Sequence, residues 1–404
     1  MVIKKNDQIN CLNIETIKNK QKSTNSQCFH VWFPNIFEFK GGIQVYSAFL
    51  LQALQSLYPH CEYDVFLKHD TRCLSNVSFL KKTRFHFAGK WHIKLRTLAF
   101  ATQLFKFGLW QSPSLIISTH LNFTIIAYLL KYLKGIPYWT VAHGIEAWNL
   151  TNPTLQKALH HADRIFAVSS YTRDRLLEEQ NLNPDKISLL PVTFDVNRFE
   201  ITPKPKNLLE RYNLAPEQLV ILTVARLACS DRYKGYDQVI RALPQIRQQI
   251  PNIHYLLVGK GEDRPRIEQL VQSLNLQEHV TLAGFVPDEE LVAHYNLCDV
   301  FAMPSKREGF GIVYLEALAC GKPTLAGNQD GAVDALCQGE LGALVDPDDM
   351  SAIAQTLIQI LQGTYPNPLI YQPEVLRQKV IDQFGFEHFR QTIGNYLEEY
   401  FISI

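Results

Sequence analysis

The feature that most constrains the fold of this chain is the alternation of short apolar runs with longer amphipathic segments. Short runs rich in branched and aromatic residues are typical of strands buried on both faces of a parallel sheet. Parallel neighbours need a crossover connection, usually a helix, so the alternation predicts repeated strand–helix units. In the first half of the chain the runs are FHVWFP (29–34), YDVFLK (63–68), SLIIST (114–119), YWTVAH (138–143), RIFAVS (164–169) and ISLLPV (187–192).

The alternation continues in the second half of the chain. There the runs are VILTVAR (220–226), HYLLVG (254–259), VTLAGF (280–285), DVFAMP (299–304), PTLAG (323–327) and GALVD (342–346). The two sets are separated by DVNRFEITPKPKN (195–207), which has two prolines, mixed charge and no apolar period, as expected of a hinge. We therefore predict an α/β protein with two consecutive doubly wound domains.

The chain length of 404 residues suits two domains better than one. We expect a flexible N-terminal extension at 1–25, a first domain at 26–198, a second domain at 199–384, and a C-terminal amphipathic helix at 385–404 that packs back on one of them. The composition, with 46% hydrophobic and 20% charged residues and a formal net charge of +1, is typical of a soluble globular protein. Net charge therefore indicates no particular partner.

Neither a targeting segment nor a membrane span is predicted. Residues 1–25 are polar and lack the apolar core of a signal peptide. The longest apolar stretch, FTIIAYLLKYL (123–133), is interrupted by Lys131 and is shorter than the roughly 20 residues of a spanning helix. The eight cysteines are scattered and form no CxxC pair, which favours reduced thiols in a cytoplasmic protein.

The most informative stretch is EGFGIVYLEALACGKP (308–323), which joins the end of a predicted strand to a predicted helix. Ligands of doubly wound sheets bind at the carboxyl ends of strands, and a helix N-terminus suits phosphate. Gly309 and Gly311 let a phosphate approach the backbone, and Glu308 and Glu316 can accept hydrogen bonds from sugar or ribose hydroxyls. The stretch therefore predicts a sugar-nucleotide site, although either glutamate alone would be interpreted as a solvated charge.

Two cations are candidates for the diphosphate of such a ligand. Arg226 stands at the end of a predicted strand, and Lys234 directly precedes Gly235. Core packing does not explain an arginine at a strand end, because its head must reach water or an anion. The pair could neutralise a pyrophosphate leaving group without a metal ion. Taken singly, each also fits a solvated loop cation.

The first half of the chain contains fewer candidate site residues. His143 ends the strand YWTVAH and precedes Gly144, a place from which a histidine can position or deprotonate a hydroxyl; a structural histidine is the alternative. Gly41 and Gly42 form a glycine turn that could face the same cleft. The DPD sequence at 346–348 has the paired carboxylates of a metal site, but a helix cap explains it, so no metal is predicted.

Together these residues resemble a known family: the retaining, nucleotide-sugar-dependent glycosyltransferases of family 4 (group 1), which have the GT-B fold of two Rossmann-like domains facing a central cleft. The two glutamates with seven residues between them are the most specific match. The matching stretches are HGIEAW (143–148), ADRIFAVSSYTRDRL (162–176), ISLLPVTFDVNRF (187–199), ARLACSDRYKG (225–235), LLVGKGEDRPRIEQL (256–270), VTLAGFVPDEELVAHYNLCDVFAMPS (280–305) and KREGFGIVYLEALACGKPTLAG (306–327).

The resemblance implies roles for these residues. Glu308 would contact hydroxyls of the transferred sugar and Glu316 the ribose, while Arg226 and Lys234 would bind the diphosphate and His143 would approach from the first domain. Glu308, His143, Arg226 and Lys234 are thus the catalytic candidates. The other donor-binding candidates are Gly309, Phe310, Gly311, Ile312 and Val313 around the phosphate and sugar, Gly259, Phe285 and Val286 beside the base, and the turn at Gly41 and Gly42.

The resemblance also implies front-face transfer, in which the departing phosphate oxygen accepts the proton of the acceptor, with neither a cofactor nor a metal. It further implies that the C-terminal helix crosses back to the first domain. Two features depart from the family's pattern. VTFD (192–195) replaces the usual Asn-Gly before the aspartate, and the spacing from Arg226 to Lys234 is longer than usual, so Arg232 competes with Lys234 for the diphosphate.

Charge is distributed unevenly within the first domain. No acidic residue occurs between Asp70 and Glu146. The segment GKWHIKLRTLAFATQLFKFGLW (89–110) mixes lysine and arginine with tryptophan and leucine, as in helices that lie on anionic membranes. We hypothesise docking on a membrane or on an anionic lipid-linked acceptor; a core helix with a solvated basic face is an equally good interpretation. Nucleic acid fits less well, since no binding motif accompanies the charge. The basic residues of this interval are Arg72, Lys81, Lys82, Arg84, Lys90, Lys94, Arg96, Lys106, Lys131 and Lys134.

The expected function is transfer of a hexosyl unit, such as mannose, glucose or galactose, from a UDP- or GDP-sugar to a glycan or lipid-linked acceptor, in cell-surface polysaccharide or glycolipid synthesis. The expected location is the cytoplasm, at the inner face of the membrane. Two alternatives stay open: a non-transferring relative such as a nucleotide-sugar epimerase, and a catalytically silent nucleotide-sugar-binding protein. The residues do not identify base, sugar or acceptor, because these contacts come from backbone and from variable loops.

Overall fold

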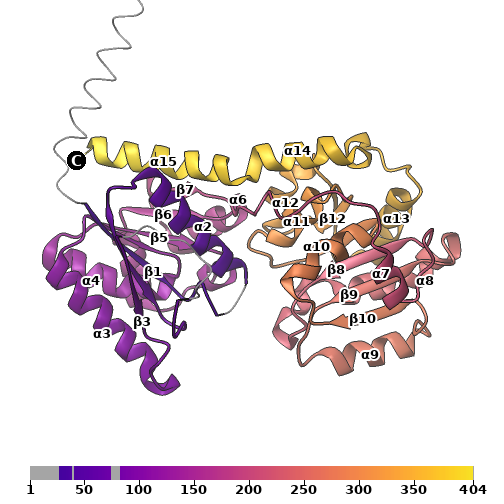
Figure 1. Cartoon of the computed structure of the whole chain (residues 1–404), viewed down its shortest axis with the longest axis horizontal. Coiled ribbons are helices and arrows are strands. Elements are labelled where there is room, and N and C mark those ends of the chain that lie inside the picture. Colours follow the sequence, from indigo (N-terminus) through magenta and orange to yellow (C-terminus); the bar gives the residue numbers. More distant parts are fainter. Residues whose placement is uncertain (1–26, 39–40, 74–81, 404) are drawn as a thin grey trace, which may run out of the picture.

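The computed structural model describes residues 27–38, 41–73 and 82–403, and in these residues two parallel sheets are flanked by helices (Figure 1). The strand order is β3-β2-β1-β4-β5-β6-β7 in the first sheet and β10-β9-β8-β11-β12-β13 in the second. In both sheets the order reverses beside the first strand, which defines a doubly wound topology. The predicted fold class is therefore confirmed. The expected extension at 1–25 lies outside the described residues.

The first sheet is built from strands of mostly buried residues. Its strands are β1 (Cys28–Phe33), β2 (Glu62–Leu67), β3 (Thr83–Phe87), β4 (Leu115–Ser118), β5 (Tyr138–Ala142), β6 (Arg164–Ala167) and β7 (Ile187–Leu189). Its helices are α2 (Gly42–Leu57), α3 (Ile93–Gln111), α4 (Thr124–Lys134), α5 (Pro153–His161) and α6 (Ser170–Gln180). Alternate residues of β1 enter different cores: Phe29 and Val31 pack with residues of α2, and Trp32 packs with residues of α3 and α4. The sheet is thus covered on both faces, as predicted.

Strand β3 was not among the predicted strands. Its sequence TRFHF alternates polar and apolar residues, and none of them is fully buried. It forms the edge of the sheet and pairs with β2 alone. TRFHF contains no continuous apolar run, so the criterion that found the other strands did not detect it.

The second sheet contains β8 (Val220–Val224), β9 (His254–Val258), β10 (Val280–Gly284), β11 (Val300–Met303), β12 (Thr324–Gly327) and β13 (Ala343–Val345). Its helices are α7 (Lys206–Arg211), α8 (Tyr236–Gln249), α9 (Arg264–Ser273), α10 (Asp288–Leu297), α11 (Ile312–Ala319), α12 (Ala332–Ala335), α13 (Met350–Leu361) and α14 (Pro373–Phe384). Short 3-10 turns connect elements of both domains: η1 (Leu121–Phe123), η2 (Ile145–Ala147), η3 (Pro184–Lys186), η4 (Cys229–Lys234), η5 (Cys337–Gly339) and η6 (Pro368–Tyr371).

The last helix, α15 (Phe386–Ser403), runs back along the first domain, as Figure 1 shows. Phe389 meets the ring of Tyr46 edge-on, with 5.4 Å between the centroids. The guanidinium of Arg164 stacks on Tyr396 at 4.7 Å and donates to Glu399 (2.9 Å). The chain therefore crosses between the domains twice, and both crossings contact each other through a bridge of Phe194 with Gly385. In the described residues no helix is long and apolar enough to cross a membrane.

Candidate functional site

The candidate site begins where the loop after β11 meets the N-terminus of α11. Gly311 starts this helix in the left-handed region (φ 89°), which favours glycine. The N–H of Glu308 donates to Oδ2 of Asp330 (2.7 Å), and the N–H of Gly331 donates to the carbonyl of Glu308 (2.9 Å). Asp330 is buried and also accepts from the hydroxyl of Ser305 (2.7 Å). These bonds fix the loop beside the first turn of α11, whose unpaired N–H groups favour an anion.

Glu308 forms an ion pair with Lys234, which stands at the end of η4. The Nζ and Oε2 atoms lie 2.5 Å apart, and the two side chains are only 16% and 17% exposed. Burial acts to lower the pKa of Lys234, but Glu308, together with Tyr233 and Asp231, outweighs this effect and the pKa is raised. A Cβ on the next residue, Gly235, would lie 2.2 Å from the carbonyl oxygen of Pro304. Only glycine therefore lets η4 approach the β11 loop closely enough to form this pair.

The two arginines near Lys234 have carboxylate partners of their own. Nε of Arg226 donates to Asp231 (2.6 Å), while the arginine side chain is 65% exposed. Arg232 donates to the buried Asp263 (2.7 Å). Of the two cations expected to compete for the diphosphate, Lys234 lies against Glu308 and Arg232 lies against Asp263; the preference for Lys234 stays a prediction. Arg226 is at the predicted strand end and is accessible to a ligand.

Glu316 lies on the second turn of α11 and is 9% exposed. It accepts a hydrogen bond of 2.6 Å from the hydroxyl of Tyr295, on α10. Burial raises the pKa of Glu316 to about 7, against the opposing effect of the bond from Tyr295. The two glutamates of the predicted motif therefore lie in different surroundings: Glu308 has a cationic partner and Glu316 has a neutral one.

From the first domain, His143 projects at the carboxyl end of β5. The ring Nε2 lies 3.1 Å from the carbonyl oxygen of Thr119, and the backbone N–H of His143 donates to the carboxylate of Glu146 (2.5 Å). The ring of Tyr46 packs edge-on against the imidazole at 4.9 Å. Burial lowers the pKa of His143 to about 3, so the ring is neutral at physiological pH. Because a carbonyl can only accept, Nε2 carries the proton and Nδ1 is left as an acceptor for a ligand hydroxyl.

At this site the backbones of the two domains lie so close together that no side chain fits between them. A Cβ on Gly309 would lie 1.8 Å from the carbonyl oxygen of His143, and one on Gly144 would lie 2.7 Å from Cα of Gly309. A second contact joins α12 to the N-terminus of α6, where the hydroxyl and N–H of Ser170 donate to Asp334 (2.7 and 2.8 Å). The β11 loop and His143 therefore belong to one site built from both domains.

The other predicted donor-binding residues fall into three groups. Ile312 and Val313 form the first turn of α11, and Phe310 is buried against Phe384 of α14, so Phe310 can offer a ligand only its backbone. The second group is at the ends of β9 and β10. A Cβ on Gly259 would lie 1.8 Å from the carbonyl oxygen of Ala225.

In that second group, the side chain of Phe285 is 64% exposed and lies under the ammonium of Lys260, 4.6 Å from the ring centroid. Val286 follows it and is half-buried. The third group is the turn at Gly41 and Gly42, which starts α2; Gly42 is exposed and a Cβ there would meet nothing within 4 Å. The turn is at the same edge of the sheet as His143, since α2 contacts that histidine through Tyr46.

Sequence reasoning missed three residues that organise the site: Asp330, Tyr295 and Asp334. Asp330 follows the strand PTLAG, so its place near a strand end could have indicated it. Tyr295 and Asp334 carried no usable signal. Their partners, Glu316 and Ser170, lie far away in the sequence, and the pairing depends on how helices and domains pack.

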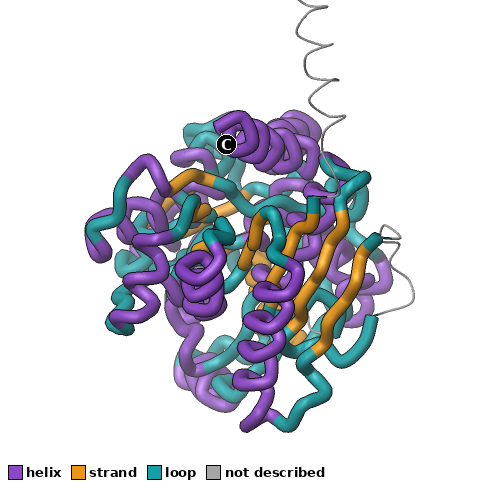
Figure 2. Tube along the Cα trace, turned by 90° about the vertical axis from the view of Figure 1, so that its left-hand side faces the viewer, coloured by secondary structure: helices purple, strands orange, loops and turns teal. Residues whose placement is uncertain are grey.

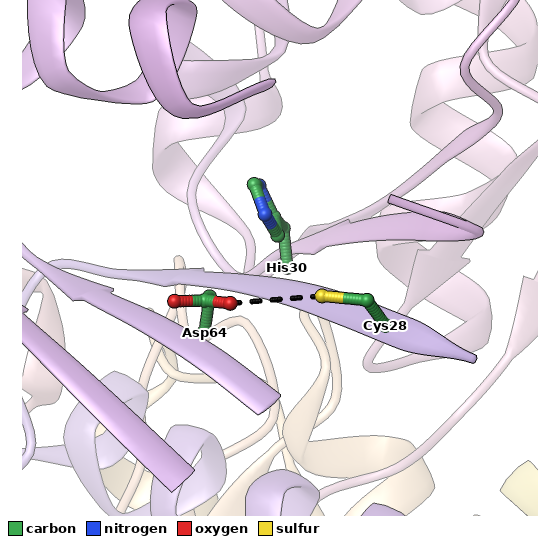
Figure 3. Close-up of side chains that lie close together, drawn as sticks. All are labelled: Cys28, His30 and Asp64. Atoms are coloured by element: carbon green, nitrogen blue, oxygen red, sulfur yellow. Dashed lines mark hydrogen bonds between the residues drawn. The ribbon is translucent and has the colours of Figure 1, made fainter. Parts of the chain in front are cut away.

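A separate polar cluster lies at the amino ends of β1 and β2, away from the site (Figure 3). One ligand atom each of Cys28, His30 and Asp64 lies within 4.8 Å of the others, close enough to suggest a metal centre. However, the carboxylate of Asp64 already accepts from Arg84 (2.6 Å) and from Nε2 of His86 (2.6 Å). Burial raises the pKa of the Cys28 thiol to about 12, so the thiol keeps its proton and donates to Asp64 (3.6 Å). These bonds neutralise a buried carboxylate, which explains the cluster without a ligand.

Models of known protein families match both domains. The family model described as Glycosyltransferase Family 4 matches residues 40–198, and the one described as Glycosyl transferases group 1 matches residues 206–371. A curated relative, the GDP-mannose-dependent alpha-(1-6)-phosphatidylinositol monomannoside mannosyltransferase of Mycolicibacterium smegmatis, is 35% identical over 232 residues. The alignment covers 54% of this chain and 59% of that relative, so the chain spans less than two thirds of its length.

Solved structures match nearly the whole chain. Sucrose-phosphate synthase from Thermosynechococcus elongatus superposes with a TM-score of 0.76 at 23% identity, covering 94% of this chain and all of that one. Anabaena HepE in complex with UDP gives a TM-score of 0.74 at 18% identity, covering 92% of this chain and 100% of the other. These likenesses confirm the predicted GT-B fold.

Proposed function

Because the chain belongs to the family 4, group 1 glycosyltransferases, we propose that it transfers a hexosyl unit from a nucleotide-diphosphate sugar to a glycan or lipid-linked acceptor, with retention of configuration. The observation that carries the proposal is the ion pair of Lys234 with Glu308, which lies next to the contact of Gly309 with the backbone of His143 in the first domain. A cation beside a helix N-terminus suits the diphosphate, and a carboxylate next to it suits the hydroxyls of the sugar.

The diphosphate is the leaving group, and its charge grows as the sugar departs. Lys234 and the first N–H groups of α11 are fixed before the ligand binds, so they can stabilise this charge without reorganisation. Arg226 is exposed and can exchange Asp231 for a phosphate oxygen. Since these groups supply the positive charge, we propose that the reaction needs no metal ion.

In the proposed step, the bond from the anomeric carbon to the diphosphate oxygen breaks, and the acceptor oxygen bonds to the same face of that carbon. The proton of the acceptor hydroxyl passes to the departing phosphate oxygen. His143 stays neutral, because burial lowers its pKa to about 3. Its role is therefore to orient a hydroxyl through Nδ1, and the reaction proceeds without a dedicated protein base.

Donor affinity should depend on the ionisation of Glu316. The ionised carboxylate accepts hydrogen bonds from ribose hydroxyls better than the acid does, and the pKa is about 7 in the free protein. Affinity should therefore rise as the pH increases through 7, by about tenfold between roughly pH 6 and pH 8. Titration of the nucleotide sugar by calorimetry across this range measures the effect. Glu316→Gln should bind more weakly and show no such slope; an unchanged slope in that variant would contradict the ribose role.

A donor panel tests the proposed function. UDP-, GDP- and ADP-sugars are scored for thermal stabilisation and for slow hydrolysis, with and without EDTA, and the anomer formed is read by NMR. We expect one donor class to stabilise the protein and to be turned over with retention in the presence of EDTA. Isomerisation of the donor without an acceptor would instead identify an epimerase, and binding without any turnover would identify a silent binding protein. Inverted product would contradict the proposed stereochemistry.

The proposal includes a cytoplasmic location, which suits the seven cysteines of the described residues, all of which are free thiols. The acceptor would reach the site from the side of the first domain.

A further inference from the structure

Helices α3 and α4 lie on the outer side of the first domain, which faces the viewer in Figure 2, and they carry a surface of exposed apolar side chains. We call it the α3–α4 face. It consists of Trp91, Ile93, Leu95, Leu98 and Trp110 in and just before α3, and Leu129, Tyr132 and Leu133 in α4. The two helices pack against each other, and these residues are exposed on both of them. Trp110 and Tyr132 are 77% and 79% exposed.

This face does not fit the alternative of a core helix with a solvated polar side. Of the 19 residues of α3, only Phe100, Leu104 and Gly108 are buried. Leu95, Leu98 and Trp110 lie on the side of α3 opposite this buried stripe, where a solvated helix would carry polar residues. Single exposed apolar residues are ordinary, but a group of eight with two tryptophans marks a surface that contacts something else.

The charged side chains on the helices of this face are all positive. Lys90, Lys94, Lys106 and Lys134 are exposed on the same two helices and the turn before α3. The chain has no acidic residue between Asp70 and Glu146. Asp163 forms an ion pair with Lys131 of α4 (2.6 Å), and Glu62 and Asp64 of β2 both pair with Arg84 (2.8 and 2.6 Å). An occupant of the face would therefore meet apolar side chains surrounded by positive charge.

We propose that the α3–α4 face docks on an anionic lipid bilayer, with its tryptophans and leucines among the head groups and its lysines on the lipid phosphates. Amphipathic helices with lysine and large apolar side chains bind membranes in this orientation. A protein partner would be expected to meet a mixture of charges around an apolar centre. Nucleic acid binding relies on phosphate contacts and gains little from exposed leucine and isoleucine.

Docking would also orient the active site. The N–H of Ala88 donates to Leu67 at the end of β2 (2.9 Å), and Arg96 donates to the carbonyl of Gly89 (3.0 Å). These bonds hold the first turn of α3 at the carboxyl edge of the sheet, the edge from which His143 projects. Trp91 and Ile93 would thus bring the bilayer to the mouth of the cleft. If the proposed transfer reaction is correct, this is where a lipid-linked acceptor would enter.

Vesicle binding tests the proposal without requiring activity. The full chain is sedimented with phosphatidylcholine vesicles that contain or lack phosphatidylglycerol, and lipids brominated along the acyl chain quench tryptophan fluorescence. Of the five tryptophans, Trp32, Trp139 and Trp148 are buried, and Trp91 and Trp110 are exposed on the face. We expect binding to the anionic vesicles, weakened by salt, with quenching that disappears in Trp91→Phe/Trp110→Phe.

Two double variants separate the face from net charge. Lys94→Glu/Lys106→Glu should weaken binding to anionic vesicles at least tenfold. The matched control, Lys206→Glu/Arg241→Glu, reverses two exposed cations in the second domain and should bind normally. Equal loss in both variants, equal binding to neutral vesicles, no binding, or tighter binding to single-stranded RNA would each overturn the proposal. Donor hydrolysis in solution should be unchanged in both variants, so failure of the proposed function would be seen separately.

Discussion

Replacing Lys234 by alanine is expected to lower kcat/KM for the nucleotide sugar by about 10²–10³-fold, the usual effect of removing one preorganised charge-stabilising group. Two losses combine. The diphosphate loses its buried counter-charge, and Glu308, which is 17% exposed, is left without its cation. Because the charge on the leaving group grows in the transition state, most of the loss should appear in kcat. Steady-state kinetics with the donor identified by the panel would measure it.

The effect of leaving Glu308 unpaired can be separated from the effect of removing the counter-charge of the diphosphate. Lys234→Ala should unfold at lower temperature than the wild type, and Lys234→Ala/Glu308→Gln should recover that stability, since no unpaired charge stays buried. The double variant should nevertheless remain inactive. Arg232→Ala is the neighbouring control, because its guanidinium is bound by Asp263 away from the site and its activity should stay near wild type. Near-wild-type turnover in Lys234→Ala would refute the role of the ion pair.

How much of the fold could be predicted depended on how deeply its strands are buried. Strands covered on both faces carry continuous apolar runs, such as IIS within β4 and VILTV in β8, and these were found. Strand β3 was missed because its sequence, TRFHF, has no continuous apolar run and its residues are only partly buried or exposed. The apolar face of α15 predicted that it packs on one of the domains, and the family resemblance implied the first domain; the residues that meet there, such as Phe389 and Tyr46, were not predictable.

For the candidate site, too, features set by neighbouring residues could be predicted, and features set by residues distant in the sequence could not. Strand ends and glycine turns are local, so sequence reasoning could propose His143, Lys234 and Glu308 as candidates. Their electrostatic state is not local. The spacing of the two glutamates did not indicate that Glu308 would be paired with Lys234, or that Glu316 would be buried beside Tyr295 with a pKa near 7. These properties arise from helices and loops that meet only in the folded chain.

The contact between the domains gives the other large effect. Gly309→Ala would place a Cβ 1.8 Å from the carbonyl oxygen of His143 and 3.2 Å from Cα of Gly144. Both neighbours are backbone atoms, so neither can rotate away, and the clash can be relieved only by moving the domains or the loop apart. We expect turnover to fall by about 100-fold or more, because even a displacement of about 1 Å impairs alignment of the reacting groups.

The thermal stability of Gly309→Ala should change little, since the strain lies between the domains and opening relieves it. Binding of the free nucleotide diphosphate, which uses mainly the second domain, should fall only a few-fold, and small-angle X-ray scattering should show a larger radius of gyration. In the matched control, Gly394→Ala on α15, the added methyl group comes within 3.2 Å of only the flexible end of Leu57, so activity should be preserved. If Gly309→Ala turned over donor like the wild type, the closed contact of Gly309 with His143 would not be the catalytic arrangement, and transfer would have to occur with the domains further apart.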